Sequence, residues 1–142
     1  MKRIPGFEDG ALPLGEFEVT VDEIEASYLV TGRYLNRPLW DVGRRRMLTR
    51  NLRKVVDLFR ETRMVSSLFV DGSFVEAIDS PSDIDAYFEL IAPHLWDDGV
   101  FQRRLRELDP HGGWTWAWEE VRMCGGKTCK PPFWCTYCLD LF

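Results

Sequence analysis

The feature that most constrains the fold is a pair of strand-like segments on either side of a glycine turn. Residues 67–71 form a short β-prone apolar run that stops abruptly at Gly72 and Ser73, as a buried strand ending in a tight turn does. From residue 83 to residue 91 one set of side chains alternates with another, the apolar set being Ile84, Ala86, Phe88 and Leu90 and the polar set Asp83, Asp85, Tyr87 and Glu89. A strand over 83–91 presents Asp83 and Asp85 on one face, about 6.5 Å apart along its axis.

A helix is the alternative for the same segment. Ser82 and Asp85 have the spacing of a capping box, and the apolar residues also fit a helical stripe. In a helix, Asp83 and Asp85 would lie about 200° apart around the axis and could not share a ligand. The glycine turn that precedes the segment favours the strand.

The remaining periodicities predict one α/β or α+β domain, in which a small mixed sheet packs against helices. Residues 1–19 are rich in Pro and Gly and are expected to form an irregular lead-in, with the domain spanning 20–142. Thr20 and Glu23 form a predicted capping box. The expected helices are 21–31, 38–61 and 98–108. The helix over 38–61 carries an apolar stripe made of Leu48, Leu52, Val55, Val56 and Phe59. The expected strands are 67–71, 83–91, 114–121 and 134–142.

Charge is unevenly distributed along the chain, whose net charge is −5. Between residues 41 and 63 basic residues outnumber acids and form a strip, namely Arg44, Arg45, Arg46, Arg50, Arg53, Lys54, Arg60 and Arg63. A solvated helix face is the favoured interpretation of this strip and phosphate contact is the alternative. No apolar run approaches the length of a membrane span and no signal-peptide core follows the basic start, so we expect a cytoplasmic protein with no membrane contact.

Three short motifs together resemble the signature of the nucleotidyltransferase superfamily that includes DNA polymerase beta. They are Asp71-Gly72-Ser73-Phe74, Asp83-Ile84-Asp85 and Leu139-Asp140-Leu141. With an LPLG element upstream and an arginine-bearing helix, the run from Leu68 to Leu90 is similar to a small uncharacterised nucleotidyltransferase-like branch. The resemblance implies a nucleotidyltransferase-like fold and transfer of a nucleoside monophosphate from a nucleoside triphosphate to an acceptor.

The residue types suit that chemistry. Mg²⁺ takes oxygen ligands from one or two carboxylates together with phosphate oxygens and water, which Asp83 and Asp85 can supply. The Gly72–Ser73 turn lets backbone N–H groups and a hydroxyl approach a phosphate. Asp140, flanked by Leu139 and Leu141, is the first candidate for a third carboxylate that binds metal or acts as a base, and Glu120 is the second.

The segment after the glycine turn departs from the pattern of the superfamily. Many small nucleotidyltransferases carry a basic residue just after the turn, whereas this chain continues as Phe74-Val75-Glu76. The sequence leaves three classes of acceptor as alternatives, a protein hydroxyl, RNA and a small molecule. The resemblance implies a toxin–antitoxin or defence context. The alternative is a catalytically inactive module that binds a protein or RNA partner through the basic helix or the tryptophan-rich tail.

Four cysteines lie near the C-terminus with the spacing C-x4-C-x5-C-x2-C, namely Cys124, Cys129, Cys135 and Cys138. Four thiolates can bind Zn²⁺, but the inner gap is shorter than in usual structural sites, so reduced or buried cysteines are favoured over zinc. If residues 134–142 form a strand, Cys135 and Cys138 point to opposite faces. The alternating row Trp114, Trp116 and Trp118 is expected to be a buried sheet face, with base stacking as the alternative.

Overall fold

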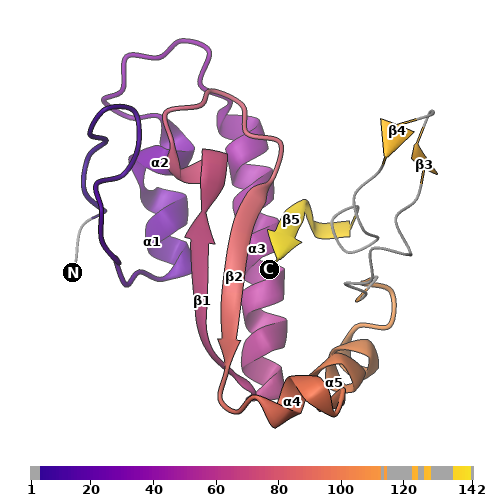
Figure 1. Ribbon diagram of the computed structural model, residues 1–142. Coiled ribbons are helices and arrows are strands. Elements are labelled where there is room, and N and C mark those ends of the chain that lie inside the picture. The colour runs from indigo at the N-terminus through magenta and orange to yellow at the C-terminus, as the bar shows by residue number, and fades with distance from the viewer. Residues whose placement is uncertain (1–3, 113, 115–122, 125–126, 129–135, 142) are drawn as a thin grey trace.

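The protein is an α+β domain built on a three-stranded mixed sheet in the order β1-β2-β5. The computed structural model describes residues 4–112, 114, 123–124, 127–128 and 136–141. Strand β1 (Val65–Asp71) pairs antiparallel with β2 (Ile84–Leu90), and β2 pairs parallel with the short β5 (Leu139–Leu141). Figure 1 shows helix α3 crossing behind the sheet, so the described helices leave the opposite face of β1 and β2 uncovered.

The alternating segment is a strand, and the helical alternative for it is wrong. Ile84 and Ala86 are almost completely buried, while Tyr87 on the other face is exposed. Both edges of β2 form ladders, to β1 along most of its length and to β5 over its first three residues. Pairing on both sides satisfies backbone groups that a helix would have satisfied internally, and it buries the apolar set against α3.

The long helix α3 (Val42–Thr62) supplies the other half of the core. It begins four residues later than the predicted 38–61, because the carboxylate of Asp41 accepts a hydrogen bond from the Arg44 N–H at 2.8 Å and caps the helix. The predicted stripe is confirmed at its centre, since Leu48, Leu52, Val55 and Phe59 are buried and Val56 is packed against the core.

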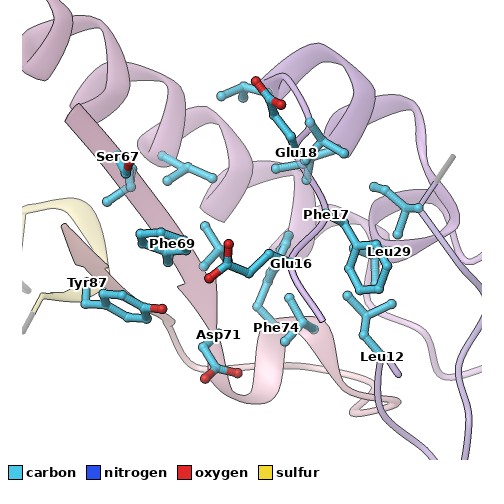
Figure 2. Close-up of a pocket in the computed structure, with 18 of the residues that line it drawn as sticks. Leu12, Glu16, Phe17, Glu18, Leu29, Ser67, Phe69, Asp71, Phe74 and Tyr87 are labelled. Carbon is cyan, nitrogen blue, oxygen red and sulfur yellow. The ribbon is translucent and has the colours of Figure 1, made fainter. Parts of the chain in front are cut away.

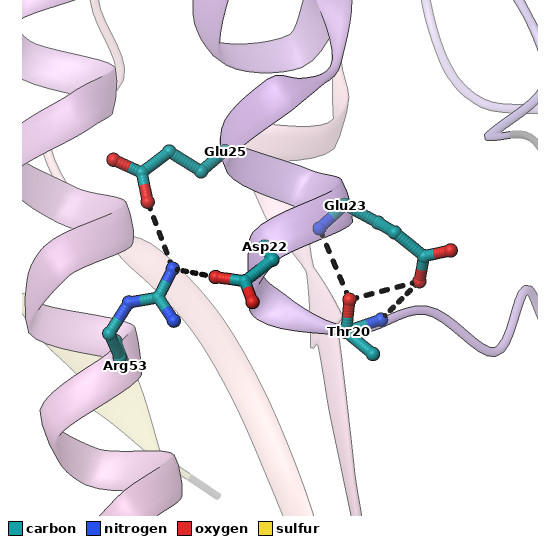
Figure 3. A network of polar contacts seen from close by, with 5 residues as sticks. All are labelled: Thr20, Asp22, Glu23, Glu25 and Arg53. Atoms are coloured by element: carbon teal, nitrogen blue, oxygen red, sulfur yellow. Dashed lines mark hydrogen bonds and ion pairs between the residues drawn. The ribbon is translucent and has the colours of Figure 1, made fainter.

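The predicted helix over 21–31 is two short helices, α1 (Val21–Ala26) and α2 (Tyr28–Thr31). Ser27 separates them: its backbone is extended, its N–H donates to the Ile24 carbonyl, and its hydroxyl caps α2. A serine that bonds the backbone locally competes with helix continuation. The predicted capping box at the start of α1 is confirmed (Figure 3), with the Thr20 N–H donating to the Glu23 carboxylate at 2.7 Å and the Glu23 N–H donating to the Thr20 hydroxyl at 3.2 Å.

The C-terminal third begins with two helices, α4 (His94–Asp97) and α5 (Val100–Leu108). Helix α5 corresponds to the helix predicted over 98–108 and is two residues shorter at its start, and the short α4 before it was not predicted. Trp114 is buried and its ring contacts those of Phe59 and Tyr137, as expected for a core tryptophan. The rest of the predicted strand 115–121, including Trp116 and Trp118, lies outside the described residues, and a small hairpin follows, β3 (Met123–Cys124) with β4 (Lys127–Thr128).

The last predicted strand, 134–142, is shorter in the structure. Residues 136–137 are helical and only Leu139–Leu141 pair with β2. Cys138 adopts a left-handed backbone with φ of 51°, which turns the chain before β5 begins. The argument that Cys135 and Cys138 point to opposite faces of one strand therefore loses its basis.

The N-terminal segment carries no regular helix over its described residues 4–19, as its Pro and Gly content predicts. It is nevertheless bonded to the domain, because the Tyr28 hydroxyl donates to the Pro5 carbonyl at 2.5 Å and the Ala77 N–H donates to the Gly10 carbonyl at 2.7 Å. Across the residues that the structure describes, none of the helices has the length and apolar character needed to cross a membrane.

Candidate active site

A row of carboxylates crosses all three strands of the sheet. In the ladders Asp71 of β1 is the partner of Asp85 of β2, and Asp85 is the partner of Asp140 of β5. Paired residues on neighbouring strands point to the same face, so the three aspartates share the face that lies away from α3. Their neighbours on the strands, Ile84 and Ala86 in β2 and Leu139 and Leu141 in β5, are buried on the core side.

Asp83 lies next to this carboxylate row, which we define as Asp71, Asp85 and Asp140. It precedes β2 by one residue, and the N–H of Ile84 donates to the Cys138 carbonyl at 3.1 Å, which continues the ladder toward it. Its side chain is 8% exposed, whereas Asp71 is exposed and the other two carboxylates are partly buried. The structure thus brings the predicted Asp83, Asp85 and Asp140 to one end of the sheet.

Asp71 belongs to the carboxylate row but was not among the candidates predicted from the sequence. The alternation within residues 67–71 was the available signal, because Leu68 and Val70 pack against the core and leave Phe69 and Asp71 on the other face. Glu120, the second candidate for a third carboxylate, lies outside the described residues.

The turn after β1 is shaped around Asp85. Gly72 has φ of +72°, and a Cβ at this position would lie 1.8 Å from an Oδ atom of Asp85 and 2.7 Å from its Cγ. No side chain other than hydrogen fits there, so the backbone of Gly72 lies directly against the carboxylate of Asp85. Ser73 follows in a short 3-10 turn, η1 (Gly72–Val75), which puts the predicted phosphate-binding residues beside the carboxylate row.

A buried arginine holds the loop that follows this turn. Arg45 of α3 is fully buried, and its guanidinium donates to the carbonyls of Phe74 at 2.6 Å, Glu76 at 3.1 Å and Ile78 at 2.6 Å. It also donates to the Leu29 carbonyl at 2.9 Å and lies over the Trp40 ring, 3.8 Å from its centre. Burial lowers the pKa of Arg45 to about 10, so the guanidinium stays charged at neutral pH.

The rest of the loop, up to Asp83, is bonded to the start of α3 and to the segment that precedes it. Asp79 accepts a hydrogen bond from Arg37 at 2.7 Å, which lowers the pKa of the Asp79 carboxyl. Asp41 accepts hydrogen bonds from the Arg44 N–H and the Ser80 hydroxyl, and both lower its pKa. Arg44 donates to the carbonyls of Pro81 and Ser82.

These contacts change the interpretation of the basic strip. Arg44 and Arg45 bond backbone carbonyls, and Arg53 forms ion pairs with Asp22 at 2.7 Å and Glu25 at 2.9 Å (Figure 3). The two interpretations of the strip, a solvated helix face and a phosphate contact, therefore do not apply to these three arginines. They tie α3 to the α1 helix and to the loop that connects β1 with β2.

Carboxylate oxygens are the ligands that Mg²⁺ prefers, and the register makes Asp85 and Asp140 direct neighbours, with Asp83 one residue before β2. In the described part of the chain, no group of three or more His, Cys, Asp and Glu side chains is placed to hold a metal ion. Mg²⁺ usually takes one or two carboxylates and completes its shell with phosphate oxygens and water. Asp85 and Asp140 form one such pair of neighbouring carboxylates.

The zinc hypothesis falls largely outside what the structure describes. Cys129 and Cys135 are not among the described residues, Cys124 belongs to β3, and Cys138 is a partly buried free thiol. Zinc binding by the four cysteines stays an untested prediction.

These observations define an α+β domain whose three-stranded sheet carries a row of carboxylates beside a glycine-serine turn. The chain belongs to the DUF6932 family, a family of unknown function, whose profile matches residues 5–142. Comparison with the curated proteins and with the solved structures found no match for the chain.

Proposed function

We propose that this protein is a magnesium-dependent nucleotidyltransferase, which moves a nucleoside monophosphate from a nucleoside triphosphate to an acceptor. The observation that carries the proposal is the register that aligns Asp71, Asp85 and Asp140 across the sheet, with Gly72 packed against Asp85. Mixed strand order and the succession of motifs along the chain agree with the resemblance to the nucleotidyltransferase superfamily.

In this proposal the turn binds phosphate and the carboxylates bind metal. The Gly72 and Ser73 N–H groups and the Ser73 hydroxyl donate to phosphate oxygens, which the close approach at glycine permits. Asp83, Asp85 and Asp140 would supply the carboxylates for Mg²⁺, of which one or two would bind the ion directly. A metal bound there supplies charge neutralisation for the phosphate oxygens and for the leaving pyrophosphate.

Asp140 also acts as the base. Its carboxylate accepts the proton of the acceptor hydroxyl, whose oxygen forms a bond to the α-phosphorus. The bond from that phosphorus to the β-phosphate oxygen breaks in line, and the electron pair leaves with pyrophosphate. The acceptor, a protein hydroxyl, RNA or a small molecule, is not specified by the site residues.

The test is calorimetric titration of the full chain with ATP, GTP, CTP and UTP, with and without Mg²⁺. The Asp83→Asn, Asp85→Asn double variant should lose magnesium-dependent binding while keeping its circular dichroism spectrum. The matched control is Asp57→Asn, Glu61→Gln, which removes the same two charges from the exposed side of α3 and should bind as the native chain does.

Binding of no nucleotide under either condition would contradict the proposal. It would leave the inactive binding or regulatory module as the better hypothesis, which the lack of a basic residue after the turn also favours. Arg44 and Arg45 do not replace that residue, because their guanidinium groups bond backbone carbonyls.

A further inference from the structure

A cavity of about 810 Å³ opens at the free edge of β1. It lies between β1, helix α3 and the N-terminal segment around residues 11–19 (Figure 2). Only Asp71 belongs both to this cavity and to the carboxylate row. A ligand whose phosphates lie at Gly72 and Ser73 can therefore reach the cavity past Asp71.

Two stacked aromatic rings lie on one side of the cavity. Phe69 and Tyr87 are ladder partners on β1 and β2, and their rings are stacked with centres 4.6 Å apart and an angle of 12° between the planes. Each ring is two residues from an aspartate of the carboxylate row, which is about 6.6 Å along the strand. Both rings line the cavity, but each covers one face of the other, so the outer face of Phe69, on the edge strand, is the one available for stacking. Aromatic faces stack nucleobases without regard to sequence.

The part of the cavity lining that comes from the N-terminal segment is acidic. Glu16 and Glu18 line the cavity from the N-terminal segment, and Figure 2 shows the Glu16 carboxylate on the side of Phe69. Over the residues that the structure describes, neither glutamate makes a hydrogen bond or an ion pair. In total four acids line the cavity, Glu16, Glu18, Asp71 and Glu76, against one cation, Arg60. Carboxylates repel phosphate groups and accept strong hydrogen bonds from N–H donors, so this excess of acids suits the base of a nucleotide better than its phosphates.

We propose that this cavity binds the nucleobase of the nucleoside triphosphate and selects bases that carry an amino group, guanine above all. The inference rests on the proposed function and adds its base preference. Guanine offers an adjacent N1–H and amino group that match the two oxygens of one carboxylate, while adenine and cytosine offer an amino group alone. Uracil presents one N–H between two carbonyl oxygens, and a carboxylate repels both of these oxygens.

The experiment compares the magnesium complexes of GTP, UTP and inorganic tripolyphosphate, titrated into the full chain. The native chain should bind GTP at least about tenfold more tightly than UTP, the size of effect that one charge-assisted hydrogen bond gives. The Glu16→Gln, Glu18→Gln variant should remove this preference and leave tripolyphosphate binding within about twofold. The Phe69→Leu variant should weaken both nucleotides by about tenfold and leave tripolyphosphate unchanged.

A matched control is the Glu8→Gln, Asp9→Asn variant, which removes two exposed charges from the same N-terminal segment outside the cavity. It should keep the native preference. The cavity proposal is overturned if the native chain binds GTP and UTP equally, or if the preference for GTP survives in the Glu16→Gln, Glu18→Gln variant. In either case, binding of tripolyphosphate would show that the proposed function still stands. Binding of neither the nucleotides nor tripolyphosphate overturns both.

Discussion

Replacing Arg45 by Met should destabilise the fold more than any other single change in the basic strip. The native guanidinium makes four hydrogen bonds to carbonyls, with lengths between 2.6 and 3.1 Å. Hydrogen bonds to a charged group contribute about 1.5–3 kcal/mol each, and the desolvation of a buried ion offsets several kcal/mol of that sum. A net loss of about 3–5 kcal/mol is expected, because methionine fills the space but leaves the carbonyls without donors.

Urea unfolding followed by tryptophan fluorescence measures this loss, with the slope of the transition expected to stay constant. Arg46→Met is the matched control, since Arg46 is the exposed neighbour on the same helix and should change stability by less than about 0.5 kcal/mol. If the two variants lie within about 1 kcal/mol of each other, the reasoning that Arg45 anchors the loop is wrong. Arg45→Lys should fall between them, because one ammonium offers three donors from a single point.

Two further perturbations follow from the turn and from the loop. The Gly72→Ala variant should bind magnesium–nucleotide at least about tenfold more weakly, as measured by calorimetry. The new Cβ displaces Asp85, and the left-handed backbone costs about 1–2 kcal/mol for a residue other than glycine. The control is Gly6→Ala, where a Cβ meets open space, and this variant should bind as the native chain does. The Arg37 hydrogen bond lowers the pKa of Asp79 below its unfolded value near 3.9, so its stabilising contribution is present above that pH and is lost as the pH falls through the folded pKa. The urea midpoint of Asp79→Asn should therefore lie below the native one at pH 6 and approach it below about pH 4, and a gap that stays constant with pH would contradict this.

The parts of the fold that depend on local periodicity could be predicted. Alternation over 83–91 predicted the strand whose outward face carries Asp85, and the stripe on α3 identified its core side, because both depend only on the geometry of a single element. Asp83 lies one residue before this strand. The glycine turn was visible for the same reason. The fold class, a small mixed sheet packed with helices, followed from these elements and is confirmed.

The parts that depend on contacts distant in sequence could not be predicted. Arg45 is buried only because carbonyls from residues 29 and 74–78 converge on it, and nothing in the helix pattern distinguishes it from the exposed Arg46. The partnership of Asp71 with Asp85 needed the strand register, which periodicity does not specify. Whether the site transfers nucleotides stays a prediction, since the fold alone does not determine the reaction.

The short parallel strand β5 has a consequence for how the protein folds. The β1–β2 pair closes a loop of roughly a dozen residues, whereas β5 must return across roughly fifty residues to reach β2, at a higher entropic cost. Three residues of pairing offer little to offset that cost early in folding. We therefore expect Asp140 to join the row late, so that a folding intermediate can hold Asp71 and Asp85 in register and still lack the third carboxylate.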